Sequence, residues 1–153
     1  MIQLRRVRRL LCFILFLLAL HLAQPVVTAA TAPDQKHRVI ILTDIEADPD
    51  DTQSLVRLFL YSNQIDLKGL VATTSCWKKT SVAPASIRRV IQAYGKVQPN
   101  LAQHEVGFPK AKALLQLVKS GLPKYGMLGV GEGKDSEGSD WIIKELEEND
   151  ERP

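Results

Sequence analysis

The sequence has little cysteine, with only Cys12 and Cys76 among its 153 residues. Cys12 lies within an amino-terminal apolar stretch that we expect to be removed, so Cys76 would remain alone and no internal disulfide could form. Because Cys12 is in the middle of that stretch and not at its end, a lipid-anchored cysteine is not expected either. A packed hydrophobic core therefore has to hold the rest of the chain together.

The chain also lacks an apolar run long enough to span a membrane. Arginines at positions 5, 6, 8 and 9 precede an apolar core from Leu10 to about Ala23, and small residues follow up to Ala30. This core has about 14 residues, whereas a spanning helix needs about 20. The pattern predicts a signal peptide over residues 1–30, cleaved after Ala29 or Ala30. A secreted or periplasmic protein without a membrane anchor would follow, with a polar linker over residues 31–37.

Basic residues are not in excess outside this leader. The whole chain has a net charge of +3, from 20 basic and 17 acidic residues. Without the four leader arginines, 16 basic side chains face 17 acidic ones, which gives −1. Binding to nucleic acid needs a basic patch on the folded domain, so we do not expect nucleic acid as a partner.

The hydrophobic pattern of the remaining chain is that of an α/β protein, without internal repeats. Apolar runs rich in β-branched residues predict strands over residues 38–43 and 65–73, the first of them buried on both faces as in a parallel sheet. The segment 51–63 between them predicts a helix, which Asp50 or Asp51 could cap. Strand, helix and strand together have the size of one βαβ unit.

Three further helices are predicted after this unit. Apolar side chains recur every three to four residues over 87–94 and over 111–118, and DWIIKELEEND predicts a last helix capped by Ser139. A glycine-rich loop precedes the last helix. Because two strands make a poor sheet, we expect the chain to be the amino-terminal part of a longer domain. A compact small domain is the alternative, and it would need short strands near 97–101 or 127–130.

The segment after the first predicted strand, DIEADPDD, concentrates negative charge. It contains five acidic residues in eight positions: Asp44, Glu46, Asp48, Asp50 and Asp51. Each pair of carboxylates about 4 Å apart costs roughly 4 kcal/mol at an effective dielectric of about 20. A hard divalent cation would offset this repulsion best, because calcium and magnesium prefer oxygen ligands. The alternative is a solvated loop with one capping aspartate.

Two known acidic motifs fit this segment poorly. In an EF-hand calcium loop, Pro49 would occupy the glycine position and Leu55 the final glutamate position. Phosphatases of the haloacid dehalogenase type have aspartates at i and i+2 and then Thr or Val at i+4, but Glu46 and Asp48 stand at the second and third of these positions.

A third motif, D-x-D-x-x-x-D-D, has all four acidic positions filled, the second by Glu46. With GLVATTSCW, NLAQHEVGFPKAKALL and YGMLGVGEGKDSEGSDWII, it makes the chain resemble the nucleoside hydrolase-like family of secreted bacterial proteins, some of them described as cellulose-binding. This family belongs to the inosine/uridine-preferring nucleoside hydrolase superfamily. The resemblance implies an α/β fold, a mostly parallel sheet with flanking helices, of which residues 38–153 would be the amino-terminal part.

The resemblance also implies a calcium site and residue roles. Asp44, Glu46 and Asp51 would surround the ion, and Glu46 or Asp50 would be the catalytic base that takes a proton from a water molecule. Trp77, where nucleoside hydrolases have a Gly-Asn pair, could stack on a sugar or pack beneath its own loop. A further aspartate ligand and a leaving-group histidine, which the superfamily takes from its carboxyl-terminal half, have no counterpart in this chain.

Two functions are therefore expected. The first is calcium-dependent hydrolysis of N-glycosidic or related glycosidic bonds by the full-length form, with this chain alone inactive. The second is carbohydrate or cellulose binding on the same fold without catalysis, which Glu46 and the missing Gly-Asn pair favour. A small-molecule or glycan ligand suits both, and a homo-oligomer is left open.

Overall fold

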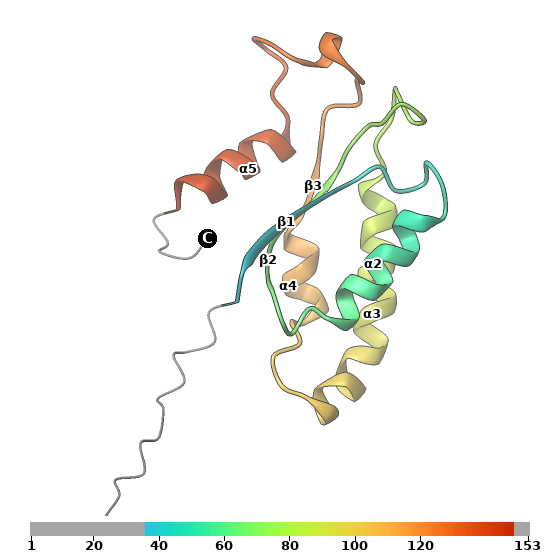
Figure 1. Cartoon of the computed structure of the whole chain (residues 1–153), viewed down its shortest axis with the longest axis vertical. Helices are drawn as coiled ribbons and strands as arrows, with labels where there is room; N and C mark the ends of the chain where they lie inside the picture. Colours follow the sequence, from blue (N-terminus) through green and yellow to red (C-terminus); the bar gives the residue numbers. More distant parts are fainter. Residues whose placement is uncertain (1–35, 149–153) are drawn as a thin grey trace, which may run out of the picture. The chain divides into compact units, whose positions relative to one another are not determined.

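The computed structural model describes residues 36–148, so the predicted signal peptide and most of the predicted linker lie outside the described residues. The described residues form a three-stranded parallel sheet in the order β1-β2-β3. Helices α2, α3 and α4 lie on one side of this sheet and α5 lies on the other (Figure 1). The predicted α/β class, with a parallel sheet and flanking helices, is confirmed.

The predicted βαβ unit is present. It consists of β1 (Arg38–Thr43), α2 (Asp50–Leu60) and β2 (Asp66–Ala72). The prediction that the first strand is buried on both faces is wrong for the described residues, because β1 lies at the edge of the sheet and Leu42 is 59% exposed. The predicted capping of α2 by Asp50 or Asp51 is also wrong. Pro49 is the N-cap residue and makes no side-chain cap, while both aspartates lie in the first turn.

The rest of the described chain contains one more strand than predicted. Its elements are α3 (Pro84–His104), α4 (Ala111–Gln116), β3 (Val118–Ser120), the 3₁₀ turn η1 (Met127–Gly129) and α5 (Glu137–Glu147). The predicted helix 111–118 ends early, because Val118 pairs with Leu70 in the sheet and is buried there. The alternative strands near 97–101 and 127–130 are wrong, since the first segment is part of α3 and the second begins with η1.

The predicted cap of α5 is shifted by one turn. Ser136 is the N-cap, and its hydroxyl accepts a hydrogen bond of 3.1 Å from the backbone N–H of Ser139. The hydroxyl of Ser139 in turn accepts from the backbone N–H of Ser136 at 2.7 Å. Two serines thus satisfy each other's backbone donors, as in a capping box, and the helix starts earlier than its apolar pattern indicates.

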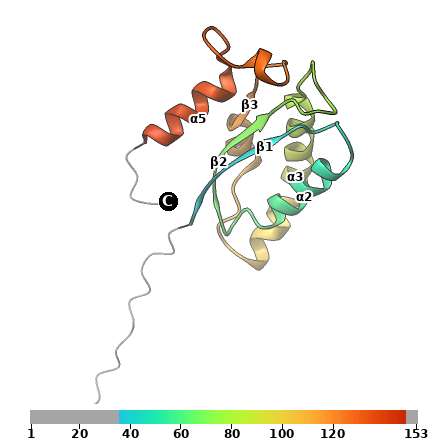
Figure 2. The same ribbon diagram turned by 45° about the horizontal axis from the view of Figure 1, so that its top comes forward.

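The two faces of β2 pack against different helices (Figure 2). Leu67, Leu70 and Ala72 belong to the buried core beneath α2 and α3, whereas Gly69 and Val71 face α5. The register with β1 shifts by one residue between Val39 and Ile40, which lets Leu67 and Leu70 share a face although they are three residues apart.

The close approach of α5 to the sheet depends on small residues. A Cβ atom on Gly138 would lie 2.6 Å from a side-chain carbon of Val71, and one on Gly69 would lie 3.3 Å from the ring of Trp141. The indole N–H of Trp141 donates a 2.7 Å hydrogen bond to the carbonyl of Lys68. None of the helices in the described part of the chain has the length and apolar character that crossing a membrane requires.

Candidate functional site

The three parallel strands end at one edge of the sheet, where their following loops meet. Thr43 pairs with Ala72, and Ala72 pairs with Ser120, so the carboxyl ends of β1, β2 and β3 are in register. The loops that follow are 44–49, 73–83 and 121–136. In open parallel sheets this is the edge at which ligands bind.

A tight turn sets the direction of the first loop. The backbone N–H of Ala47 donates to the carbonyl of Asp44 at 3.0 Å. Ile45 is buried in the core and anchors the turn. Glu46, at the third position of the turn, has a φ of +79°. That position of a type II turn requires a positive φ and is usually glycine or asparagine, so the fold accepts a strained backbone at Glu46.

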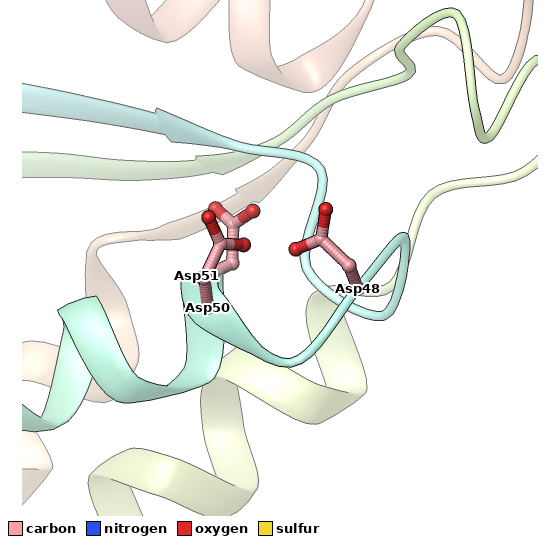
Figure 3. A group of neighbouring side chains, drawn as sticks. All are labelled: Asp48, Asp50 and Asp51. Atoms are coloured by element: carbon pink, nitrogen blue, oxygen red, sulfur yellow. The ribbon is translucent and has the colours of Figure 1, made fainter.

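Three aspartates of this loop and of the first turn of α2 converge. Asp48, Asp50 and Asp51 have carboxylate oxygens that all lie within 4.8 Å of one another. Asp48 approaches from the loop, while Asp50 and Asp51 project from the start of the helix (Figure 3). We call these three residues the aspartate cluster. The hydroxyl of Thr43, the last residue of β1, donates a hydrogen bond to Asp51 and fixes one side of the cluster.

The cluster has more negative charge than its surroundings neutralise. Burial raises the pKa of Asp51, and the charges of Asp44 and Asp50 raise it further. A hydrogen bond with the side chain of Asp50 raises the pKa of Asp48. Within residues 36–148, no lysine or arginine forms an ion pair with the cluster. Both pKa values therefore rise in the direction expected for carboxylates that lack a cation.

Asp44 lies at the border of the cluster. A hydrogen bond from the hydroxyl of Ser75, in the loop after β2, lowers the pKa of Asp44, and a side-chain hydrogen bond with Asp51 lowers it further. The side chains of Asp44 and Asp51 are therefore neighbours, and their role as two ligands of one ion stays a prediction. The donors offered here are oxygen atoms, which suits a hard divalent cation such as calcium.

Glu46, which the resemblance implied as both ligand and base, is directed elsewhere. Its carboxylate accepts hydrogen bonds from Lys78 at 3.2 Å, from Arg89 at 3.0 Å and from the hydroxyl of Ser86. These bonds, that from Ser86 first, lower the pKa of Glu46. We call this set of contacts the Glu46 clamp. The structure thus brings Asp50 and Asp51 together with Asp48, places Asp44 beside them, and leaves Glu46 outside.

Lys78 joins two loops of the site. Its ammonium group also donates to the carbonyl of Ile45 at 3.0 Å. Its side chain is only 12% exposed. Arg89 and Ser86 complete the clamp from the first turns of α3, where Arg89 donates to the Ser86 hydroxyl at 2.6 Å. The sequence analysis did not identify Ser86 and Arg89, which lie about 40 positions from Glu46 along the chain.

Trp77, the predicted sugar-stacking residue, is 82% exposed and does not pack beneath its loop. It sits on a turn in which the backbone groups of Ser75 and Lys78 bond each other at 3.1 and 3.2 Å. The backbone N–H of Trp77 donates to the Ser75 hydroxyl at 3.1 Å. The turn is therefore ordered, and the indole is presented to solvent beside the acidic loop.

The parallel α/β fold and the acidic loop after β1 fit the nucleoside hydrolase-like class of domains. Residues 38–153 match the family described as "Cellulose-binding Sde182, nucleoside hydrolase-like domain", and the chain belongs to this family. The predicted resemblance is confirmed.

The chain is also similar to a solved structure. This is a nucleoside hydrolase-related hypothetical protein from Saccharophagus degradans that is associated with carbohydrate metabolism, with 46% identity and a TM-score of 0.74. The similarity covers 77% of this chain and 29% of the other, so the chain spans less than a third of that relative. The comparison with curated proteins yields no match.

Proposed function

We propose that this chain binds carbohydrate at the carboxyl edge of its sheet, with a calcium ion held by the aspartate cluster and Asp44, and that it does not hydrolyse glycosidic bonds. Export is part of the proposal and is supported by the leader pattern of residues 1–30. The cellulose-binding description of the family and the carbohydrate association of the similar solved structure support a glycan ligand.

The Glu46 clamp is the observation that carries this proposal. A general base has to be within reach of the proton that it removes and needs a pKa near the working pH. Three donors hold the carboxylate of Glu46 and lower its pKa, which makes it a weaker proton acceptor. The residue implied as a base instead ties the acidic loop to α3.

The aspartates suit a binding role. Asp51, Asp50 and Asp48 offer oxygens close to one another, and Asp44 adds a fourth carboxylate in contact with Asp51. A bound calcium ion would neutralise their repulsion and could accept sugar hydroxyls as further oxygen ligands, since calcium takes six to eight. Trp77 lies on the neighbouring loop and could stack on the sugar.

Two measurements test this function. Calorimetric titration of the purified chain with calcium should show one saturable site, and retention on insoluble cellulose should be lost when calcium is removed with a chelator. Incubation with nucleosides and oligosaccharides should release neither free base nor reducing sugar. Retention on cellulose that is indifferent to the chelator would contradict the calcium site, and measurable release of base or sugar would contradict the binding-only function.

Calcium-dependent hydrolysis of N-glycosidic bonds is the second candidate, and the position of Asp50 in the aspartate cluster, outside the Glu46 clamp, favours it. Calcium, when bound, would lower the pKa of a water molecule. The neighbouring Asp50, one of the two residues implied as a base, would then be available to take the proton. Product release that disappears in Asp50→Asn but persists in Glu46→Gln would establish this candidate in place of the first.

A further inference from the structure

Exposed apolar side chains gather on two loops at the site edge. The loop after β2 exposes Trp77, and the loop after β3 exposes Tyr125, Met127, Leu128 and Val130. Loops that face only water seldom concentrate large apolar side chains, whereas ligand-binding surfaces do. Because both loops follow parallel strands, they lie at the same edge as the aspartate cluster (Figure 1).

A backbone contact joins the two loops next to their aromatic residues. The N–H of Tyr125 donates to the carbonyl of Lys79 at 2.9 Å, and Lys79 is two positions from Trp77. Lys78, between them, is fixed to the acidic loop through Ile45 and Glu46. The backbones that carry the two rings are thus tied to each other and to the acidic loop, and a preorganised surface loses little conformational entropy on binding.

We propose that Trp77 and Tyr125 form one stacking platform for successive rings of an uncharged polysaccharide chain. A pyranose ring has an apolar C–H face that suits an aromatic ring and a hydroxyl rim that suits nearby polar groups. Two aromatic residues on separate loops offer two stacking positions, so an oligosaccharide gains from both and a monosaccharide from one.

The charges around the platform favour a neutral ligand. Lys78 is already paired with Glu46, and a calcium ion would neutralise the aspartate cluster, so little unpaired charge remains to attract an anionic or a cationic polysaccharide. The carboxylates of the cluster could accept hydrogen bonds from the hydroxyl groups of a neutral sugar. This inference rests on the proposed function, because it specifies the ligand that the same edge of the sheet would take.

The test compares three alanine variants of the full chain in the presence of calcium. Trp77→Ala and Tyr125→Ala should each weaken binding of cellohexaose at least tenfold, since loss of one aromatic stacking contact typically has about this effect. The matched control is Tyr61→Ala, an exposed tyrosine that follows the opposite end of α2, and it should bind like the wild type. Binding of glucose should be much weaker and should not depend on both rings.

A fluorescence measurement reports on the platform directly. Trp77 is exposed and Trp141 is not, so cellohexaose should shift the emission of the wild type and of Tyr61→Ala but not that of Trp77→Ala. Wild-type binding with unchanged affinity in both platform variants would overturn the inference and leave the proposed function standing. Absence of glycan binding by the wild type would instead refute the proposed function. A wild-type dimer that becomes monomeric in Trp77→Ala would show that a second copy covers these rings, which would also overturn the inference.

Discussion

The acidic residues at the two ends of the acidic loop differ in how their negative charge is neutralised. On one side, Glu46 is paired with two cationic groups and a hydroxyl, and its pKa is lowered. On the other side, the aspartate cluster has no ion-pair partner among residues 36–148, and the pKa values of Asp48 and Asp51 are raised. The opposite shifts occur within six positions of the chain.

This contrast indicates which acids have a structural role and which are available to a ligand. Glu46 is already satisfied by the protein and accepts a left-handed backbone, which costs about 1 kcal/mol or more for a residue other than glycine. The cluster has no cationic partner among residues 36–148, so a bound cation would offset its repulsion. The same loop thus contains a glutamate that is paired with α3 and Lys78 and aspartates that have no cationic partner among residues 36–148.

The largest expected effect comes from removing one charge of the cluster. Asp51→Asn should weaken calcium binding by at least about 100-fold, because it removes a ligand, and even loss of a residue that only supports a ligand costs about 10- to 100-fold. Glu46→Gln should change the affinity less than threefold. Calorimetric titration measures both. Asp140→Asn, an exposed aspartate in the first turn of α5, is the matched control.

An equal loss of calcium affinity in Glu46→Gln and Asp51→Asn would contradict the proposal that the aspartate cluster binds calcium and Glu46 does not. Glu46 would then have to leave its clamp and join the ion, as the resemblance to nucleoside hydrolases implied.

The second prediction concerns Lys78, a cationic member of the Glu46 clamp. Lys78→Met should lower the free energy of unfolding by about 2 kcal/mol, because the variant loses a largely buried charged group that donates to both Glu46 and the carbonyl of Ile45. Urea denaturation monitored by circular dichroism measures the change. Lys79→Met, the exposed neighbour, should change stability by less than about 0.5 kcal/mol. An equal change in unfolding free energy in the two variants would show that the contacts of Lys78 with Glu46 and Ile45 do not stabilise the fold.

The main elements of the fold were predictable because their signals are local. The apolar runs of β1 and β2 and the helical spacing of α2 and α3 lie within single elements. The strand β3 was not predictable, because it has three residues and exists through its pairing with Leu70, Val71 and Ala72. Val118 fits the preceding helical pattern equally well, and only the sheet decides its conformation.

The acidic site was predictable in position but not in arrangement. The density of charge after β1 indicated a cation site, and the structure brings together Asp48, Asp50 and Asp51 there. The direction of the Glu46 side chain depends on a positive φ that glutamate seldom adopts and on partners from α3. No local pattern in the sequence contains that information, since it arises from the packing of α3 against the loop.

The third prediction concerns Glu46 itself, the acidic member of the Glu46 clamp. Glu46→Gln should lower the free energy of unfolding by about 1 kcal/mol at neutral pH, which is near the upper end for a half-exposed ion pair. The effect should be smaller than that of Lys78→Met, because glutamine can still accept from Ser86 and Lys78 still bonds Ile45. Thermal unfolding should show a decrease of several degrees for a domain of this size. A Glu46→Gln variant more stable than the wild type would mean that the strain at this position outweighs the clamp.

The smallest expected effect is the pH dependence of the difference in unfolding free energy between the wild type and Glu46→Gln. Because the pKa of Glu46 is lowered in the folded chain from its ordinary value of 4.5, its contribution is fully present above about pH 4.5 and is lost as the pH falls through the folded-state pKa. Total stability is a poor readout, since the raised pKa values of Asp48 and Asp51 act in the opposite direction. The difference in stability between the wild type and Glu46→Gln isolates Glu46 from them. We expect this difference to be constant from pH 7 to about pH 5 and to shrink toward zero below that. A difference that grows on acidification would mean that Glu46 prefers its protonated form in the folded chain, and the two sides of the loop would then not differ as described.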